Sequence, residues 1–113
     1  MNEPVPWSVW IARVLFEEGN TFKNRPVIIL NNNTVLCMCD VLAVTSKPKS
    51  NRHVYRIKNT ECIKLTKESY VKLSAIELKH DDLCEFLGML DKRDRMGLIS
   101  SMQAGCYGSM FCD

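Results

Sequence analysis

The chain has 113 residues, 46% of them hydrophobic and 25% charged, as in an ordinary soluble globular protein, which excludes a chain that is disordered as a whole. A net charge of +2 is too small to identify a polyanionic partner by itself. No run reaches the roughly 18 apolar residues of a membrane span, and the start does not resemble a secretion signal. We therefore expect a cytoplasmic protein without a membrane partner, built as a single domain over residues 1–113.

Five strands are predicted in the first part of the chain. Residues 7–16 are rich in aromatic and β-branched residues, as a mostly buried strand is. Residues 26–30 and 34–44 form the next two strands, joined by a turn at the three asparagines 31–33, because asparagine tolerates positive φ. Two further strands are expected over residues 53–57 and 69–78. Between these two, residues 62–65 form either a short strand or an irregular segment.

Helices are predicted only after the strands. Apolar residues at positions i, i+3, i+4 and i+7 between residues 83 and 90 predict an amphipathic helix. A second helix is expected to begin at Asp91 and to end near Gln103. The core then spans about residues 7–102, and residues 103–113 form a loosely packed or frayed tail. Strands followed by helices predict an α+β, β-rich fold, a small curled antiparallel sheet or partly open barrel with C-terminal helices.

The six cysteines are expected to be free thiols, because no export signal precedes them. Cys37 and Cys39 are the only close pair, with a single residue between them. On a strand, this places both side chains on one face. Structural zinc sites usually have two to four residues between paired cysteines. The sequence therefore predicts neither a metal site nor a cofactor.

Polar residues mark the ends of two apolar strands. Arg25 precedes the strand at residues 26–30, and Thr45 and Ser46 follow the strand at residues 34–44. If the two strands are adjacent, a guanidinium group and two hydroxyl groups lie close together and can bind a phosphate ester. The simpler interpretation is a surface arginine and a turn at the end of a strand, since short motifs have high false-positive rates.

A basic stretch with interleaved rings follows Ser46. Residues 47–58 contain no acidic residue. One interpretation is a solvated hairpin. The other is a surface for single-stranded RNA, with cations at the phosphates and rings stacked on the bases. The candidate RNA-binding residues are Lys47, Lys49, Arg52, His53, Tyr55 and Arg56.

Two segments carry a resemblance to a known family: Arg25-Pro26-Val27-Ile28-Ile29-Leu30 and, later, Val44-Thr45-Ser46. In this order, after an aromatic-containing first strand and a glycine-containing loop, they resemble the MazF/PemK family of toxins from bacterial toxin–antitoxin modules. Residues 69–74 are similar to a later strand of that family. The expected C-terminal helices also fit the end of its members.

The resemblance implies an SH3-like barrel and a homodimer that is opposed by a cognate antitoxin protein. It also implies metal-independent, sequence-selective cleavage of single-stranded RNA by attack of a 2′-hydroxyl, leaving a cyclic phosphate. Arg25 and Thr45 correspond to residues that this family uses in catalysis. Ser46 corresponds to a contact in the active site or with the phosphate, so the expected catalytic residues are Arg25, Thr45 and Ser46.

The chain departs from the family pattern in three places: the first strand lacks a Gly-Asp before its aromatic residue, the loop at residues 17–19 is short, and residues 74–77 differ. Residues 74–77 read Ser-Ala-Ile-Glu, where many relatives carry a glutamine and an arginine. The loss of that cation leaves an alternative function open. In this alternative the chain is an inactive relative, a non-catalytic RNA- or protein-binding module on the same fold.

Overall fold

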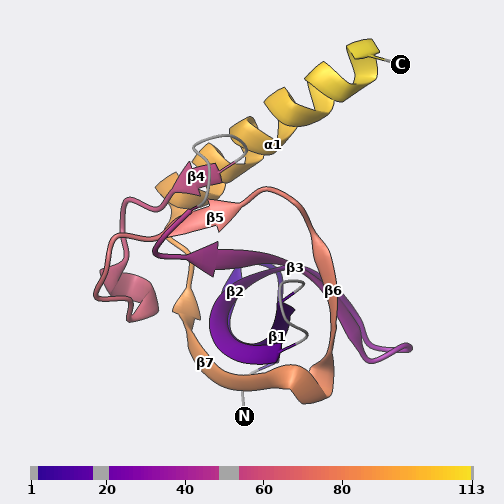
Figure 1. Cartoon of the computed structure of the whole chain (residues 1–113), viewed down its shortest axis with the longest axis vertical. Coiled ribbons are helices and arrows are strands. Elements are labelled where there is room, and N and C mark those ends of the chain that lie inside the picture. The colour runs from indigo at the N-terminus through magenta and orange to yellow at the C-terminus, as the bar shows by residue number, and fades with distance from the viewer. Residues whose placement is uncertain (1–2, 17–20, 49–53, 113) are drawn as a thin grey trace.

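Antiparallel strands make up most of the computed structural model, which describes residues 3–16, 21–48 and 54–112, with side chains except those of Phe16 and residues 104–112. The predicted RNA-binding residues Lys49, Arg52 and His53 lie outside the described residues. The strands are β1 (Ser8–Phe16), β2 (Thr21–Asn33), β3 (Met38–Thr45), β4 (Val54–Arg56), β5 (Tyr70–Lys72), β6 (Ile76–Lys79) and β7 (Leu83–Met89). Two 3-10 helices, η1 (Glu61–Ile63) and η2 (His80–Asp82), and one α-helix, α1 (Lys92–Cys112), complete the described part (Figure 1).

The strands form one strongly curled sheet (Figure 1). Its order is β4-β5-β3-β2-β1-β7, and β6 pairs with the other part of β3. Every pairing in the described residues is antiparallel. The prediction of a small curled antiparallel sheet in an α+β fold is therefore confirmed.

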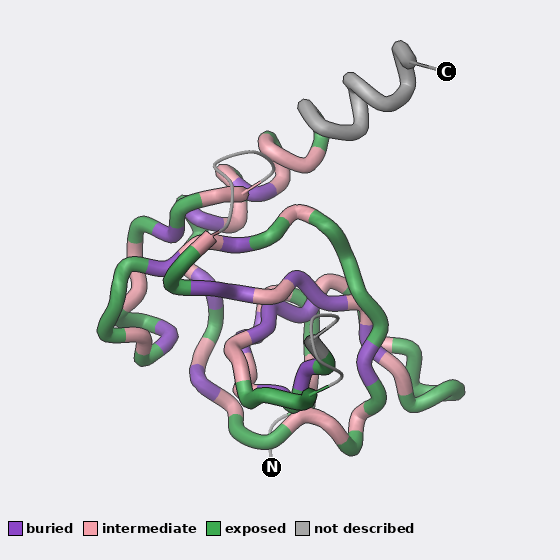
Figure 2. Tube along the Cα trace, viewed as in Figure 1, coloured by how far each residue is buried: buried purple, intermediate pink, exposed green. Residues whose placement is uncertain are grey.

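Both faces of the central strands are covered, which explains the unbroken apolar run in β2. Val27, Ile28 and Ile29 are all fully buried, although neighbouring residues of a strand point to opposite faces. Ile28 belongs to a cluster with Ile63 of η1 and Leu98 of α1. Val27 and Ile29 belong to a second cluster with core residues of β1, β3 and β6. The buried core follows the curl of the sheet (Figure 2).

The prediction of a helix over residues 83–90 is wrong, because residues 83–89 form strand β7. β7 pairs with β1 through two register shifts, which interrupt the alternation of a regular strand and leave apolar residues at a helix-like spacing. Gly88 has a φ of 152°, and a Cβ added to it would collide with the backbone oxygen of Cys62. The close approach of these two backbones requires glycine at this position.

Only one C-terminal helix is present in the described residues, and it is longer than predicted. α1 begins at the predicted place, where an Asp91 side-chain oxygen accepts a hydrogen bond of 2.8 Å from the backbone N–H of Arg93. The helix does not end near Gln103 but continues to Cys112, so the backbone over residues 103–112 is helical, and the loose packing predicted for this segment stays a prediction. α1 starts beside β4 and extends away from the sheet (Figure 1). No helix in the described ranges is long and apolar enough to cross a membrane.

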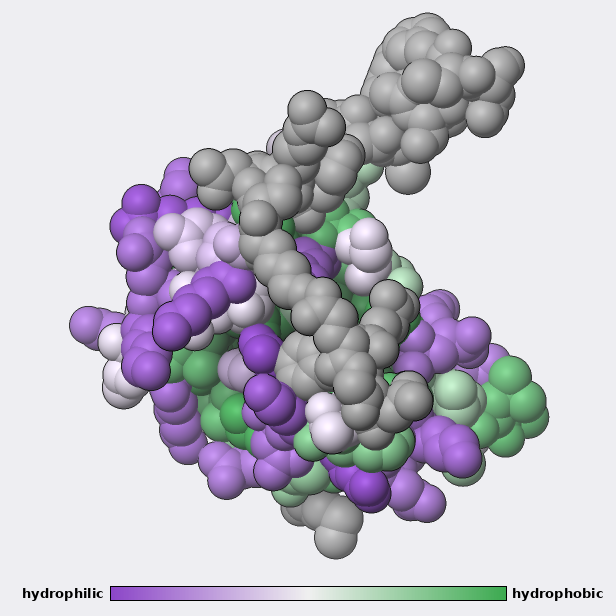
Figure 3. Space-filling model, in the orientation of Figure 1, coloured by the Kyte–Doolittle hydropathy of each residue, from purple (hydrophilic) through white to green (hydrophobic). Residues whose placement is uncertain are grey.

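Local differences from the prediction have identifiable causes. The β2–β3 turn lies after the asparagines, because the Asn33 side chain accepts hydrogen bonds from the backbone N–H groups of Val35 and Leu36. The tip of this turn is apolar and projects from the sheet (Figure 3), with Val35 88% exposed. Cys37 lies in the turn at a φ of 54°, whereas Cys39 is buried in β3, so the pair does not share a strand face. The strand predicted over residues 69–78 is divided into β5 and β6, and residues 62–65 overlap η1.

Candidate functional site

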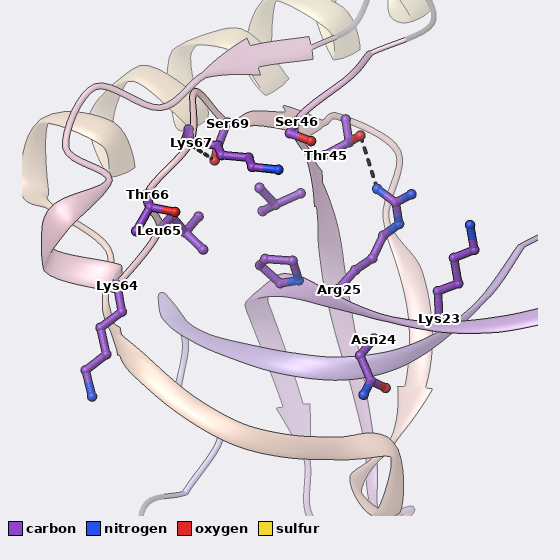
Figure 4. A pocket seen from close by; sticks show the side chains of 12 residues that line it. Lys23, Asn24, Arg25, Thr45, Ser46, Lys64, Leu65, Thr66, Lys67 and Ser69 are labelled. Carbon is purple, nitrogen blue, oxygen red and sulfur yellow. Dashed lines mark hydrogen bonds between the residues drawn. The ribbon is translucent and has the colours of Figure 1, made fainter.

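Arg25 and Thr45 come together because β2 and β3 are neighbours in the sheet. Val27 pairs with Ala43, and continuing this antiparallel register by two residues places Arg25 opposite Thr45. An Nη1–H of Arg25 donates a hydrogen bond of 3.2 Å to Oγ1 of Thr45 (Figure 4). Arg25 is half-buried, Thr45 is buried, and Ser46, the next residue, is exposed. Two of the three residues expected in catalysis are thus in direct contact, and the third is adjacent.

The hydrogen bonds around Thr45 define which way its hydroxyl acts. Its oxygen accepts a hydrogen bond from Arg25 and a second one, of 3.2 Å, from the backbone N–H of Lys47. A hydroxyl has two acceptor lone pairs and one hydrogen to donate. With both acceptor positions used, the hydroxyl of Thr45 keeps its hydrogen for donation to another group. The geometry therefore suits a hydrogen-bond donor to a ligand oxygen better than it suits a base.

A pocket of about 390 Å³ opens beside this pair. One wall carries Arg25, Thr45 and Ser46 from β2 and the end of β3 (Figure 4). The opposite wall, called here the 65–69 wall, carries Leu65, Thr66, Lys67 and Ser69. The lining also includes Pro26 and Val44, whose apolar side chains are called here the apolar floor. The remaining lining residues are Lys23, Asn24 and Lys64.

The lining gives the pocket a positive character. Among the described residues that line it are four cationic side chains and no acidic one: Lys23, Arg25, Lys64 and Lys67. Clustered cations and hydroxyl donors beside an apolar floor match a nucleotide, which combines an anionic phosphate with a flat base. No group of three or more histidine, cysteine, aspartate or glutamate side chains suited to a metal ion occurs within the described ranges.

The 65–69 wall is the part of the site that the sequence did not predict. Lys64 follows η1 in a left-handed conformation with a φ of 56°, which turns the chain toward the pocket. Ser69 is buried, and its hydroxyl donates a hydrogen bond of 2.8 Å to the backbone oxygen of Lys67. The wall then leads into β5, where Tyr70 pairs with Thr45. A run of hydroxyl and lysine side chains just before a predicted strand was the only signal in the sequence.

Two of the predicted RNA-binding residues make contacts within the protein. The hydroxyl of Tyr55 donates a hydrogen bond of 2.8 Å to a carboxylate oxygen of Asp94 in α1. The ring of Tyr55 lies so close to Gly97 that a Cβ there would overlap it. Arg56 forms a surface ion pair of 2.6 Å with Glu68. Lys47 is exposed beside Ser46. RNA contacts by Tyr55, Arg56 and Lys47 stay predictions, and those of Tyr55 compete with its contact to α1.

The contact between Tyr55 and Asp94 makes the stability of the fold vary with pH in the alkaline range. Partial burial, together with the hydrogen bond to Asp94 and its negative charge, raises the pKa of Tyr55 to about 12. In the unfolded chain a tyrosine ionises near pH 10, so the unfolded state releases its proton first as the pH rises. From pH 10 to pH 12 we therefore expect the unfolding free energy of wild type to fall relative to that of Tyr55→Phe, which has no hydroxyl to ionise. Urea unfolding of both proteins across this range measures it, and a constant difference would contradict the assignment.

Among the comparisons with known proteins, the solved structures identify the fold. No protein-family model matches the chain, and no curated protein matches it. Among solved structures, the chain is similar to an endoribonuclease in complex with its cognate antitoxin from a mycobacterial species, with 15% identity, a TM-score of 0.69 and 90% and 93% of the two chains covered. It is also similar to the Mycobacterium tuberculosis toxin MazF-mt6, with 20% identity, a TM-score of 0.64 and coverage of 84% and 91%. A MazE-MazF complex from Deinococcus radiodurans matches with 15% identity, a TM-score of 0.63 and coverage of 88% and 92%. The chain therefore has a MazF-like toxin fold.

Proposed function

We propose that the chain is a sequence-selective endoribonuclease toxin that cleaves single-stranded RNA without a metal ion. The observation that carries the proposal is the hydrogen bond between Arg25 and Thr45 at the edge of a basic pocket, on a MazF-like fold. The family resemblance in the sequence singles out both residues, and both line the same pocket. The similar solved structures, among them an endoribonuclease and a MazF toxin, support this reaction class.

The proposed reaction needs only the RNA, water and the side chains of the pocket. The 2′-oxygen attacks the adjacent phosphorus, the bond from phosphorus to the 5′-oxygen breaks, and a 2′,3′-cyclic phosphate and a 5′-hydroxyl form. Water takes the proton of the 2′-hydroxyl and returns one to the leaving oxygen, because the pocket is open to solvent. The guanidinium of Arg25 and the hydroxyl of Thr45 donate hydrogen bonds to the phosphate oxygens as negative charge grows on them. Ser46 contributes a further hydroxyl from the exposed end of β3.

The proposal includes protein partners. Two of the similar structures are complexes, one with a cognate antitoxin and one of MazE with MazF. We accordingly assign this chain a cognate antitoxin that opposes its activity. A homodimer in the cytoplasm, where RNA substrates are present, completes the proposal.

The test is cleavage of a long single-stranded RNA by the purified chain in the presence of a chelator. We expect discrete fragments with 5′-hydroxyl and 2′,3′-cyclic phosphate ends. The same RNA with a 2′-deoxy substitution at the mapped cleavage position should remain intact there, because the attacking group is missing. Arg25→Ala protein purified in parallel controls for a contaminating nuclease. If no RNA is cut under any of these conditions, the proposal is wrong.

The alternative of binding without cleavage came from the departure at residues 74–77. In the structure Ile76 and Glu77 lie in β6, paired with Val41 and Asp40, and none of the residues 74–77 lines the pocket. Residues 74–77 of this chain therefore contribute no side chain to the described pocket. A non-catalytic module predicts saturable, salt-sensitive RNA binding with no product, and product formation in the cleavage assay would exclude it.

A further inference from the structure

Lys67 stands on the 65–69 wall, opposite Arg25, and its ammonium group points into the pocket toward the end of β3 (Figure 4). We propose that Lys67 is a second phosphate-binding residue of the site, which holds the RNA backbone from the wall opposite Arg25. This inference rests on the proposed function, because it names a further substrate contact of the same site. Neither the family resemblance nor the sequence pattern assigned it a role.

The backbone around Lys67 is held in place by hydrogen bonds. The Ser69 hydroxyl bonds the carbonyl oxygen of Lys67, and the carbonyl oxygen of Ser69 accepts a hydrogen bond of 2.9 Å from the N–H of Ile57. The next residue, Tyr70, pairs with Thr45 in the sheet. The register of β3 and β5 thus fixes the position of the Lys67 backbone relative to the Arg25–Thr45 pair. The ammonium group of Lys67 points into the pocket from this fixed backbone, as a contact with a phosphate bound there requires (Figure 4).

The charge distribution around Lys67 also favours an anionic ligand. Its neighbour Glu68 is not part of the pocket lining, and its carboxylate pairs with Arg56 at the surface. The described lining therefore presents Arg25 and Lys67 on facing walls with no carboxylate between them. An anion between the walls interacts favourably with both cations. A phosphodiester supplies that charge, and its base can rest on the apolar floor formed by Pro26 and Val44.

Lysine binds phosphate as a point charge, so Lys67 is expected to act on all RNA sequences alike. Removing one such contact weakens binding uniformly and lowers the salt dependence. For single-stranded nucleic acid, the slope of log affinity against log salt should decrease in magnitude by about 0.7 for one phosphate. We expect about a tenfold loss of affinity at low salt, an order-of-magnitude value for one ionic contact.

The experiment measures binding of a mixed-sequence 2′-O-methyl RNA oligonucleotide, which cannot react because its 2′-oxygen is blocked. Lys67→Met removes the charge and retains most of the side-chain length, and Lys67→Arg should restore binding. Lys79→Met is the matched control, because Lys79 is an exposed lysine of β6 outside the pocket lining. Fluorescence anisotropy at several salt concentrations gives affinity and slope for each protein. The proposal is overturned if Lys67→Met behaves like wild type, or if Lys79→Met shows the same loss.

The same set of proteins separates this inference from the proposed function. If wild type binds the oligonucleotide in a Lys67-dependent way and cleaves no RNA, the endoribonuclease proposal fails and the Lys67 assignment stands. If wild type cleaves RNA and Lys67→Met keeps the wild-type KM and salt slope, the Lys67 assignment fails and the endoribonuclease proposal stands. If wild type does not bind the oligonucleotide at all, Lys67 has no phosphate-binding role. Thermal unfolding confirms that the variants are folded, as expected for an exposed side chain.

Discussion

Arg25→Ala is expected to lower kcat/KM for RNA cleavage by about 10³-fold or more. Removing one preorganised donor from a developing oxyanion typically lowers the rate by about 10²- to 10³-fold, and arginines that face a transferring phosphoryl group contribute as much or more. Arg25 supplies both a charge and the hydrogen bond that orients Thr45. Its loss therefore weakens two contacts to the phosphate. Single-turnover cleavage of an RNA that contains the mapped site measures the effect.

Three further proteins define the role of Arg25. Arg25→Lys keeps a positive charge but loses the planar guanidinium, so its activity should lie well below wild type. Arg93→Ala is the matched control, because Arg93 is an exposed arginine in the first turn of α1. The double variant Arg25→Ala with Thr45→Val should lose less than the sum of the two single losses, since the two groups contact each other. Wild-type rates for Arg25→Ala, or equal losses for Arg93→Ala, would contradict the role assigned to Arg25.

The meeting of Arg25 and Thr45 could be predicted from the sequence because it depends on short-range features. A turn joins two apolar segments, and antiparallel neighbours bring the start of the first beside the end of the second. The turn itself lies later than predicted, after Asn33, but the register still places Arg25 opposite Thr45. Arg25 lies within β2 and not before the strand as predicted, because β2 begins already at Thr21. It still reaches the same corner as Thr45 at the end of β3, despite the wrong turn position.

Other parts of the molecule could not be read in this way, because they depend on contacts between distant segments. β7 looks like a helix in the sequence, since its apolar spacing reflects two irregularities in its pairing with β1. The 65–69 wall has no period of its own, and it reaches the pocket through the pairing of Tyr70 with Thr45. The hydrogen bond from the Tyr55 hydroxyl to Asp94, 39 residues away in sequence, likewise has no local signal, and the RNA contact of Tyr55 stays a prediction.

Asp94 itself is a charged residue in the first turn of α1 and is completely buried. Its carboxylate accepts hydrogen bonds from the Tyr55 hydroxyl at 2.8 Å and from the backbone N–H groups of Lys58 and Asn59 at 2.9 and 3.0 Å. Burial of a carboxylate is unfavourable unless its oxygens are hydrogen-bonded, and these donors together with the helix N-terminus provide the compensation. Asp94 thereby fixes α1 to the segment between β4 and η1, which leads into the 65–69 wall.

Asp94→Ala should lower the free energy of unfolding by about 4 kcal/mol, because it leaves one hydroxyl and two backbone N–H groups without their acceptor. Natural domains are stable by only about 5–15 kcal/mol, so the variant should be close to unfolding at room temperature. Urea denaturation followed by circular dichroism gives the value, with an unchanged slope if the unfolded state is the same.

Asp94→Asn tests whether the carboxylate is needed or only its shape. The amide keeps one acceptor oxygen and turns an N–H donor toward the donors of the 55–59 segment, so its loss should lie between wild type and Asp94→Ala. Lys92→Ala is the control, because it changes another charged residue of the same helical turn. Lys92 is exposed, so this variant should unfold like wild type. Combining Asp94→Ala with Tyr55→Phe should add little to the loss from Asp94→Ala alone, because both changes remove the same hydrogen bond. A loss below about 1 kcal/mol for Asp94→Ala would mean that water satisfies the three donors and that α1 does not depend on this carboxylate.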